Sequence, residues 1–120
     1  MILGIVRGNS PRVRLPLPGL TGPIMVELVV DTGFEGDLAL PPSLLRRLEV
    51  TPLERRLALM PDGREEEVYA YEAEMEWDDE PRLVEVLELE GRPLLGVLLL
   101  NTSHLHVEGN EGGEIIIEPL

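Results

Sequence analysis

The sequence predicts a mostly β protein with one or two short helices, and two observations support this fold class. First, 12 Gly and 11 Pro fall between short apolar runs, which is typical of many short strands joined by turns. Second, several runs alternate apolar and polar residues with the period of two expected of half-buried strands. The length of 120 residues predicts a single domain, residues 1–120.

The first half of the chain is expected to contain four strands and a helix. The strands are predicted at Ile2–Arg7, Arg12–Leu17, Ile24–Val30 and Leu38–Leu40, each followed directly by Gly, Pro or Asp. The third is a nearly continuous, β-branched apolar run, as in a buried strand. Ser43 follows two prolines and is a suitable N-cap, which predicts a short helix over Leu44–Leu48.

The second half is expected to be mostly β as well. Residues 61–64 read Pro-Asp-Gly-Arg, a strong hairpin signal, between arms predicted at Glu54–Met60 and Glu67–Trp77. The second arm alternates, with apolar and aromatic residues on one face and Glu on the other. The segments that follow are predicted as strands at Arg82–Leu89, His104–Glu108 and Glu114–Glu118 and as a compact apolar segment at Leu94–Leu100.

Charge and composition exclude several classes of function. All ten basic residues are Arg, against 23 Asp and Glu, for a net charge of −13. A chain this acidic lacks the basic surface that binds nucleic acid or an anionic membrane, so neither is an expected partner. No apolar run has the length of a membrane span and no signal peptide is recognisable, so a cytoplasmic location is expected. The absence of Cys excludes disulfides, thiolate metal sites and a cysteine nucleophile.

The main chemical feature is Asp31-Thr32-Gly33, which follows directly on the apolar run Val26–Val30. A carboxylate at the end of a buried strand is costly to the fold unless it has partners or a function. Asp, Thr and Gly are also common turn residues, so a plain turn is the alternative interpretation of the tripeptide alone.

In its context, this tripeptide resembles that of the retropepsin-like aspartic proteases, and more closely their small single-domain bacterial members. The resemblance rests on residues 29–36, Val-Val-Asp-Thr-Gly-Phe-Glu-Gly, and on Leu38-Ala39-Leu40-Pro41 after them. The Asp62-Gly63 hairpin lies where the family has its flap. Leu94-Leu95-Gly96 matches the family's second signature, which a short helix follows. The resemblance extends over most of the chain and implies a closed, β-barrel-like acid protease fold.

The resemblance implies an aspartic endopeptidase that needs no cofactor and no metal. Two facing carboxylates cannot both ionise cheaply and therefore share a proton. One can then act as general base on a water while the other acts as acid toward the substrate carbonyl. The chain has one Asp-Thr-Gly, so such an enzyme must be a homodimer with Asp31 of each copy at a two-fold axis. Its substrate is implied to be a peptide or protein.

The resemblance also implies roles for individual residues. Asp31, Thr32 and Gly33 form the catalytic set, with Thr32 hydrogen-bonded across the dimer. The terminal strands, Ile2–Arg7 and Glu114–Glu118, are expected to interleave between subunits. The residues implied to support the catalytic loop are Leu94, Leu95 and Gly96. The residues implied to bind substrate are Phe34, Glu35, Gly36, Met60, Asp62 and Gly63.

Two departures from the family pattern open a second hypothesis. Position 34 is Phe where the family commonly has a small residue, and a ring there can narrow the cleft or fill a pocket beside the scissile bond. Glu35 adds a third carboxylate near the pair. The alternative is a catalytically inactive dimeric domain of the same fold that clamps an extended peptide. A cleft blocked by Phe34 favours the clamp, whereas room under the 61–64 hairpin favours the enzyme. A weaker third hypothesis is a β-barrel interaction module in which Asp31 is only a turn residue.

Other polar groups are better explained without chemistry. His104, His106 and Glu108 share one face of a predicted strand and are suitable metal ligands, but a solvated polar face is the favoured interpretation. The alternating Glu residues of the segment 72–76 are likewise interpreted as a solvated strand face. Ser103 and its neighbour His104 point to opposite faces of a strand, and no Gly-x-Ser-x-Gly elbow exists, so a serine hydrolase is not expected.

Overall fold

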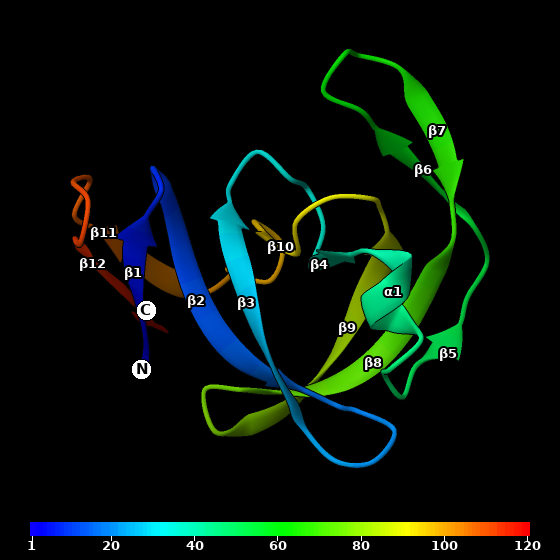
Figure 1. Cartoon of the computed structure of the whole chain (residues 1–120), viewed down its shortest axis with the longest axis horizontal. Helices are drawn as coiled ribbons and strands as arrows, with labels where there is room; N and C mark the ends of the chain where they lie inside the picture. Colours follow the sequence, from blue (N-terminus) through cyan, green and yellow to red (C-terminus); the bar gives the residue numbers. More distant parts are fainter.

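The computed structural model describes residues 1–120 and contains twelve strands and one four-residue helix, α1 (Pro42–Leu45) (Figure 1). The prediction of a mostly β fold is therefore confirmed. The strands are β1 (Ile2–Arg7), β2 (Ser10–Leu17), β3 (Ile24–Asp31), β4 (Leu38–Leu40), β5 (Thr51–Pro52), β6 (Arg56–Leu59), β7 (Glu65–Val68), β8 (Ala70–Trp77), β9 (Glu80–Glu88), β10 (Leu94–Gly96), β11 (Ser103–Val107) and β12 (Glu114–Pro119).

Ten of the strands form one sheet that is curved but open. Their order is β11-β12-β1-β2-β3-β10-β4-β9-β8-β5, while β6 pairs only with β7. The outermost strands, β11 and β5, are not paired with each other, so the expected closed barrel is absent. Pro52 in β5 has no backbone N–H to donate, which suits a two-residue strand that ends a sheet. Most neighbours are antiparallel, but β10 with β3 and β4 with β9 are parallel.

Two tight turns follow directly from the sequence. Gly8 and Asn9, between β1 and β2, have φ values of 60° and 61°, and Asp78 and Asp79, between β8 and β9, have values of 50° and 70°. A two-residue type I′ hairpin turn requires positive φ at both of its central residues, and its backbone twist matches that of the flanking strands. Gly, Asn and Asp adopt this conformation most readily. These turns fix the register of β1 with β2 and of β8 with β9.

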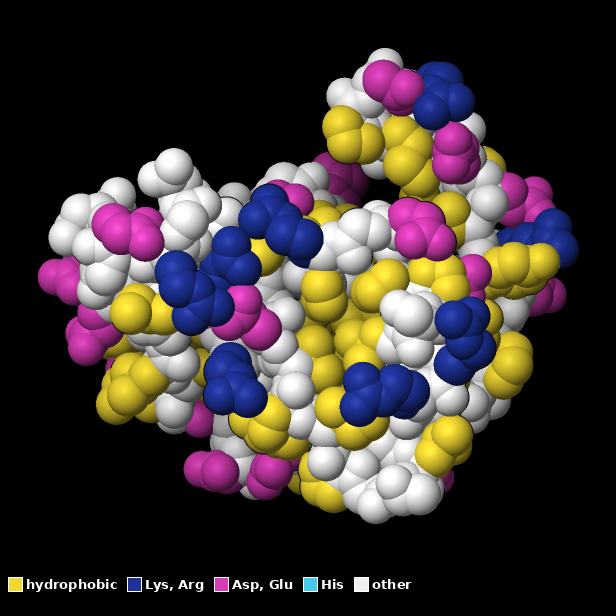
Figure 2. Space-filling view, in the orientation of Figure 1, with side chains coloured by type: hydrophobic (Ala, Val, Ile, Leu, Met, Phe, Trp, Pro, Cys, Tyr) yellow, Lys and Arg dark blue, Asp and Glu magenta, His cyan; other side chains and the backbone are white.

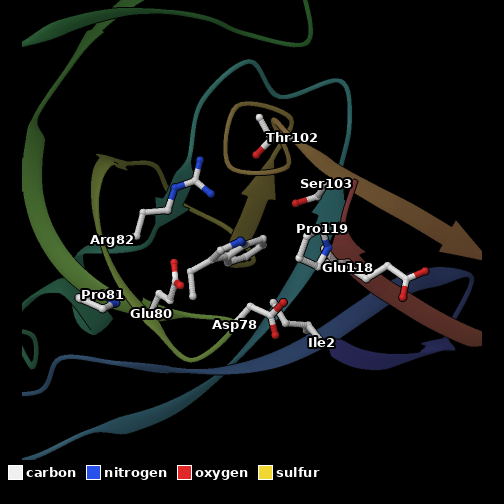
Figure 3. A pocket seen from close by; sticks show the side chains of 11 residues that line it. Ile2, Asp78, Glu80, Pro81, Arg82, Thr102, Ser103, Glu118 and Pro119 are labelled. Carbon is white, nitrogen blue, oxygen red and sulfur yellow. The ribbon is translucent and has the colours of Figure 1, made fainter.

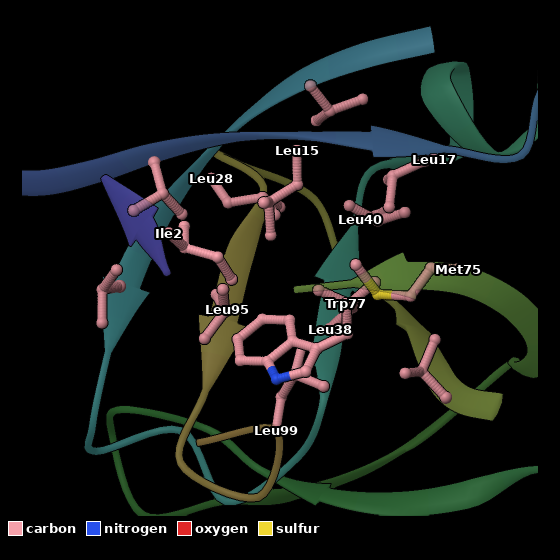
Figure 4. Close-up of a cluster of buried hydrophobic side chains, with 14 of the residues drawn as sticks. Ile2, Leu15, Leu17, Leu28, Leu38, Leu40, Met75, Trp77, Leu95 and Leu99 are labelled. Carbon is pink, nitrogen blue, oxygen red and sulfur yellow. The ribbon is translucent and has the colours of Figure 1, made fainter. Parts of the chain in front are cut away.

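A single cluster of 22 buried residues forms the core inside the curved sheet. Figure 4 shows Trp77 among leucine side chains that include Leu38 of β4, Leu95 of β10 and Leu99 of the turn after β10. The alternation predicted for the arm after the hairpin is present in β8, where Ala73, Met75 and Trp77 are buried and the intervening Glu residues are exposed.

The predicted arm Glu67–Trp77 is split at Tyr69 into β7 and β8. At this residue the chain leaves the two-stranded hairpin and enters the main sheet, and the Tyr69 carbonyl accepts a hydrogen bond from the Glu88 backbone N–H at 2.9 Å. Val68 and Ala70 on either side are both buried. The local alternation could not indicate this change of partner.

Both helix predictions need correction. The helix is Pro42–Leu45 rather than Leu44–Leu48, and its N-cap is Pro41, not Ser43. Pro42 at the first helical position loses nothing, because the N–H it lacks has no partner in a helix. The helix implied after Gly96 is absent, and residues 97–102 instead form hydrogen-bonded turns. No helix in the structure combines the length and the apolar character needed to cross a membrane.

The terminal strands are paired within one chain rather than left free to interleave. β1 lies between β12 and β2, and β12 lies between β11 and β1. The register places Leu3 opposite Ile116 and Ile5 opposite Glu114. Neither strand has a free edge, which corrects the expectation of an interleaved terminal sheet. The cause is the β11–β12 hairpin, which returns the C-terminal segment along β1.

Candidate functional site

Asp31 is the last residue of β3, where the strand leaves the core. The parallel pairing of β3 with β10 places Gly96 opposite Asp31 and Leu95 opposite Val30. Val30 and Leu95 are buried, whereas Asp31 is half-buried and lies on the opposite side of the strand from the core. The two motifs that the sequence singled out, Asp31-Thr32-Gly33 and Leu94-Leu95-Gly96, are therefore adjacent strand ends.

The loop after β3 is folded around the Asp31 carboxylate. The Gly33 N–H donates to Asp31 Oδ1 at 2.9 Å, and the Phe34 N–H donates to the Asp31 carbonyl at 3.1 Å. This is the turn that an Asp side chain makes with the backbone two residues on. Asp31 takes part in no ion pair, and Thr32 and Gly33 are exposed. One carboxylate oxygen is thus held by the chain and the other is free to act on a ligand.

Backbone hydrogen bonds attach the rest of this loop to the turn after β10. The Phe34 carbonyl accepts from Val97 N–H at 2.9 Å, and the Gly36 carbonyl accepts from Leu98 N–H at 3.2 Å. The Gly96 N–H donates to the Asp37 carbonyl at 2.8 Å. Three consecutive backbone N–H groups, those of Gly96, Val97 and Leu98, therefore hold the loop that carries Asp31.

Asp37 is a positioning residue that the sequence analysis missed. Its Oδ2 accepts the backbone N–H of Glu85, on β9, at 2.9 Å. Because Asp37 immediately precedes β4, this bond ties the end of the Asp31 loop to the neighbouring strand β9. The only signal in the sequence is that the Asp37 carboxylate directly precedes the fully buried strand β4. This position does not indicate that its hydrogen-bond donor is the Glu85 backbone N–H.

Phe34 lies over two glycines of the same site. A Cβ added to Gly36 would lie 2.6 Å from Phe34 Cζ, and one added to Gly96 would lie 2.7 Å from Phe34 Cδ2. At separations below 3.0 Å one of the two groups must shift, so the ring occupies space that any side chain at these positions would need. The Cβ of Gly96 would also lie 2.1 Å from the Gly36 carbonyl oxygen, which shows how closely the two backbones approach.

The site opens into a cleft of about 770 Å³ between the Asp31 loop and the β6–β7 hairpin. The hairpin projects from the sheet on the same side as the loop that follows β3 (Figure 1), and Figure 2 shows the hollow beneath it. Of the predicted site residues, the cleft brings together Asp31, Gly33, Phe34, Met60 and Leu94. The predicted residues that do not line it are Thr32, Glu35, Gly36, Asp62, Gly63, Leu95 and Gly96.

The tip of the hairpin is held by its own hydrogen bonds. The Met60 N–H donates to the Arg64 carbonyl at 2.7 Å, and Gly63 has a φ of 87°. Arg64 donates to Asp62 through its backbone N–H at 3.0 Å and through Nε at 2.6 Å. These two bonds, the backbone one first, lower the pKa of the Asp62 carboxyl. The Asp62 carboxylate therefore closes the turn rather than facing the cleft.

The cleft also contains three Glu residues and one Arg that the sequence analysis did not select. Glu66 comes from the hairpin, and Glu88, Glu90 and Arg92 come from the end of β9 and the loop to β10. The Tyr71 hydroxyl donates a hydrogen bond to Glu88 at 3.2 Å. The pKa of Tyr71 is raised mainly because burial disfavours its charged form, and also because of this hydrogen bond. The carboxylates outnumber the one guanidinium, which favours ligands without a large negative charge.

A second hollow, of about 430 Å³, lies near the turn between β8 and β9 (Figure 3). Arg82 lies over the Trp77 ring at 5.7 Å and donates to the Leu99 carbonyl at 3.2 Å. Ser103 lines this hollow, but neither His does. His104 and His106 are exposed on β11, and no group of three metal-ligating side chains occurs in the chain. This hollow assembles no catalytic pair.

No family model, no curated protein and no solved structure matches this chain.

Proposed function

We propose that the protein is a homodimeric aspartic endopeptidase with a retropepsin-like arrangement, in which Asp31 of two copies hydrolyses a peptide bond. The observation that carries this proposal is the placement of Asp31. Its half-buried carboxylate has no cationic partner, is fixed by the Gly33 N–H, and lies on the wall of a cleft of about 770 Å³. This volume lies within the range of about 300–1,000 Å³ that is usual for ligand sites.

The chemistry requires a second carboxylate in the same setting, and because the chain has one Asp-Thr-Gly, we assign it to Asp31 of a second copy. One carboxylate takes a proton from a water while the other, protonated, donates to the substrate carbonyl oxygen. The water oxygen bonds to the carbonyl carbon and gives a neutral tetrahedral intermediate. That intermediate collapses as the C–N bond breaks and a proton passes to the leaving nitrogen. The products are a carboxylic acid and an amine, and the carboxylate pair again holds one proton.

Exposed groups beside Asp31 support a second copy at this face. Thr32 is exposed at the tip of the loop, and Val97 and Leu98, in the turn bonded to that loop, are 42% and 52% exposed. Burial of apolar surface stabilises association at about 25 cal/mol per Å² before the costs of binding are subtracted. A two-fold axis through this face brings the two Asp31 carboxylates together and covers these side chains.

The room beneath the hairpin favours the endopeptidase over the inactive clamp. Met60 and Pro61 roof the cleft, and Phe34 forms part of its wall without filling it. The β6–β7 hairpin pairs with no other strand, which is the arrangement expected of a cover that opens for substrate and closes over it. An extended peptide can therefore lie between the hairpin and Asp31.

The proposal is tested by incubating a mixture of peptides from denatured proteins with the protein from acid to neutral pH. Wild type is expected to cleave, and Asp31→Asn is expected to abolish cleavage while keeping the fold and the dimer. Asp79→Asn, in the exposed turn between β8 and β9, is the matched control and should cleave as wild type does. Binding of peptides without cleavage by wild type would contradict the proposal and indicate the clamp.

A further inference from the structure

The geometry points to Phe34 as the residue that restricts the cleft to peptides with a small side chain, Gly, Ala or Ser, at the position beside Asp31. This inference rests on the proposed endopeptidase function. It names the substrate class that the site accepts and the residue that selects it.

The Phe34 ring cannot sink deeper into the protein. Gly36 and Gly96 lie directly against it, and even a single Cβ on either would approach a ring atom to 2.6 or 2.7 Å. Below the ring, the Gly36 carbonyl oxygen lies 2.1 Å from the position of a Cβ on Gly96, so the backbones themselves leave no space. The ring is therefore kept at the surface of the loop.

That surface is the wall of the cleft next to the catalytic carboxylate. Phe34 lines the cleft together with Asp31 and Gly33, and it is half-buried. Its backbone is fixed on both sides, since its N–H donates to the Asp31 carbonyl and its carbonyl accepts from Val97. Only side-chain rotation remains, and the two glycine backbones restrict that rotation. The ring thus takes space that a substrate side chain beside Asp31 would otherwise use.

Gly36 provides a second variant that acts in the opposite direction. The three nearest neighbours of a Cβ added there are all carbons of the Phe34 ring, at 2.6, 3.1 and 3.3 Å. Gly36 does not have a positive φ, so alanine fits its backbone conformation. Gly36→Ala forces the ring away from Gly36, and because Gly36 does not line the cleft whereas Phe34 does, we expect this movement to be toward the cleft. Phe34→Ala removes the ring. The accepted side chain is therefore expected to be largest in Phe34→Ala and smallest in Gly36→Ala.

The experiment compares kcat/KM for peptides that carry Ala or Leu at each position flanking the bond that wild type cleaves. Wild type should prefer Ala at one position by about tenfold or more, since a pocket that excludes a few carbon atoms discriminates by at least this factor. Phe34→Ala should reduce that preference about tenfold, Phe34→Leu should reduce it less, and Gly36→Ala should increase it. Leu83→Ala, which truncates an exposed side chain of β9 outside the cleft, should leave it unchanged.

Three outcomes are distinguishable. Cleavage by wild type with no position selective for Ala, or a selectivity that Phe34→Ala and Phe34→Leu both leave unchanged, overturns the role of Phe34 and leaves the endopeptidase standing. No cleavage by dimeric wild type overturns both. If Phe34→Ala does not fold, Phe34→Leu and Gly36→Ala still change the preference in opposite directions when the inference is right.

Discussion

The Phe34 ring occupies the space that a methyl group on Gly36 would need, with Cζ only 2.6 Å from the position of that methyl carbon. Both residues belong to the loop that carries Asp31, and the same ring also lies against Gly96. An aromatic residue at position 34 is therefore compatible with this loop because positions 36 and 96 have no side chain.

This relationship predicts that the effects of Phe34→Ala and Gly36→Ala on stability are not additive. Gly36→Ala alone should lower the free energy of unfolding by about 1–3 kcal/mol, the usual cost of overpacking. In the Phe34→Ala background the same change should be almost neutral, because the atoms that it meets are gone. Urea unfolding of the four proteins at one protein concentration measures the coupling. If the stability effects of the two substitutions simply add, the Phe34 ring moves away from the new methyl group at no cost, and the close contact between positions 34 and 36 is not a constraint.

Asp37→Ala should destabilise the fold by about 1–3 kcal/mol, because it leaves the Glu85 N–H without its side-chain partner. Asp37→Asn keeps an acceptor oxygen and should cost less. Thermal unfolding of both variants beside wild type checks this order. Equal losses in the two variants would mean that charge rather than the hydrogen bond stabilises the connection to β9.

Glu27 should stabilise the fold at neutral pH and lose this effect in acid, where its carboxyl becomes protonated. Arg7 donates to the Glu27 carboxylate, and so does Arg12, whose Nη1 lies at 2.9 Å, and these bonds lower the pKa of Glu27. A carboxyl whose pKa falls on folding adds stability above its unfolded pKa of about 4.3, and this stability is lost as the pH drops through the folded value. Unfolding should thus show Glu27→Gln less stable than wild type at neutral pH, with the gap closing in acid.

The matched control for this pH dependence is Glu74→Gln, on the exposed face of β8, where no ion pair is lost. Glu74→Gln removes one charge without removing an ion pair, so it should not reproduce the loss of stability that Glu27→Gln shows at neutral pH. A Glu27→Gln difference that is the same at every pH would contradict the assigned role of the two Arg side chains.

Association of the proposed dimer should strengthen with salt. Each copy carries a net charge of −13, so a dimer carries twice that, −26, and like charges oppose its formation most at low ionic strength. Sedimentation at neutral pH should give a dissociation constant that falls as salt is added, and that falls again as the pH is lowered toward the isoelectric point. A dissociation constant that responds neither to salt nor to pH would show that repulsion between the net charges of the two copies does not limit their association.

The fold class and most strands could be predicted because they depend on local patterns. The bounds of β1 were predicted to the residue, and the Glu alternation of β8 was predicted from its period of two. Local patterns do not indicate long-range partners. Nothing in the segment of β12 shows that it pairs with β1 inside the chain, and nothing at Tyr69 shows that the chain changes sheets there. The helix was misplaced because Ser43 is a better isolated N-cap than Pro41.

The candidate site divides in the same way. Asp31 and Leu94-Leu95-Gly96 were found as short motifs, and the structure places them side by side through the parallel pairing of β3 and β10. Asp37, Glu88 and Arg92 were missed because their positions depend on how two loops meet, which the spacing of residues does not encode. Phe34 was recognised as unusual, but its relation to Gly36 is visible only in three dimensions.

The central claim, that one site uses Asp31 from two copies, is tested most directly by mixing wild type with Asp31→Asn at constant total protein, above the dimer dissociation constant. After subunits exchange, equal mixing should leave about one quarter of wild-type cleavage, because only wild-type pairs hold two Asp31 carboxylates. Activity of about one half would mean that each subunit acts alone, and it would contradict the shared site.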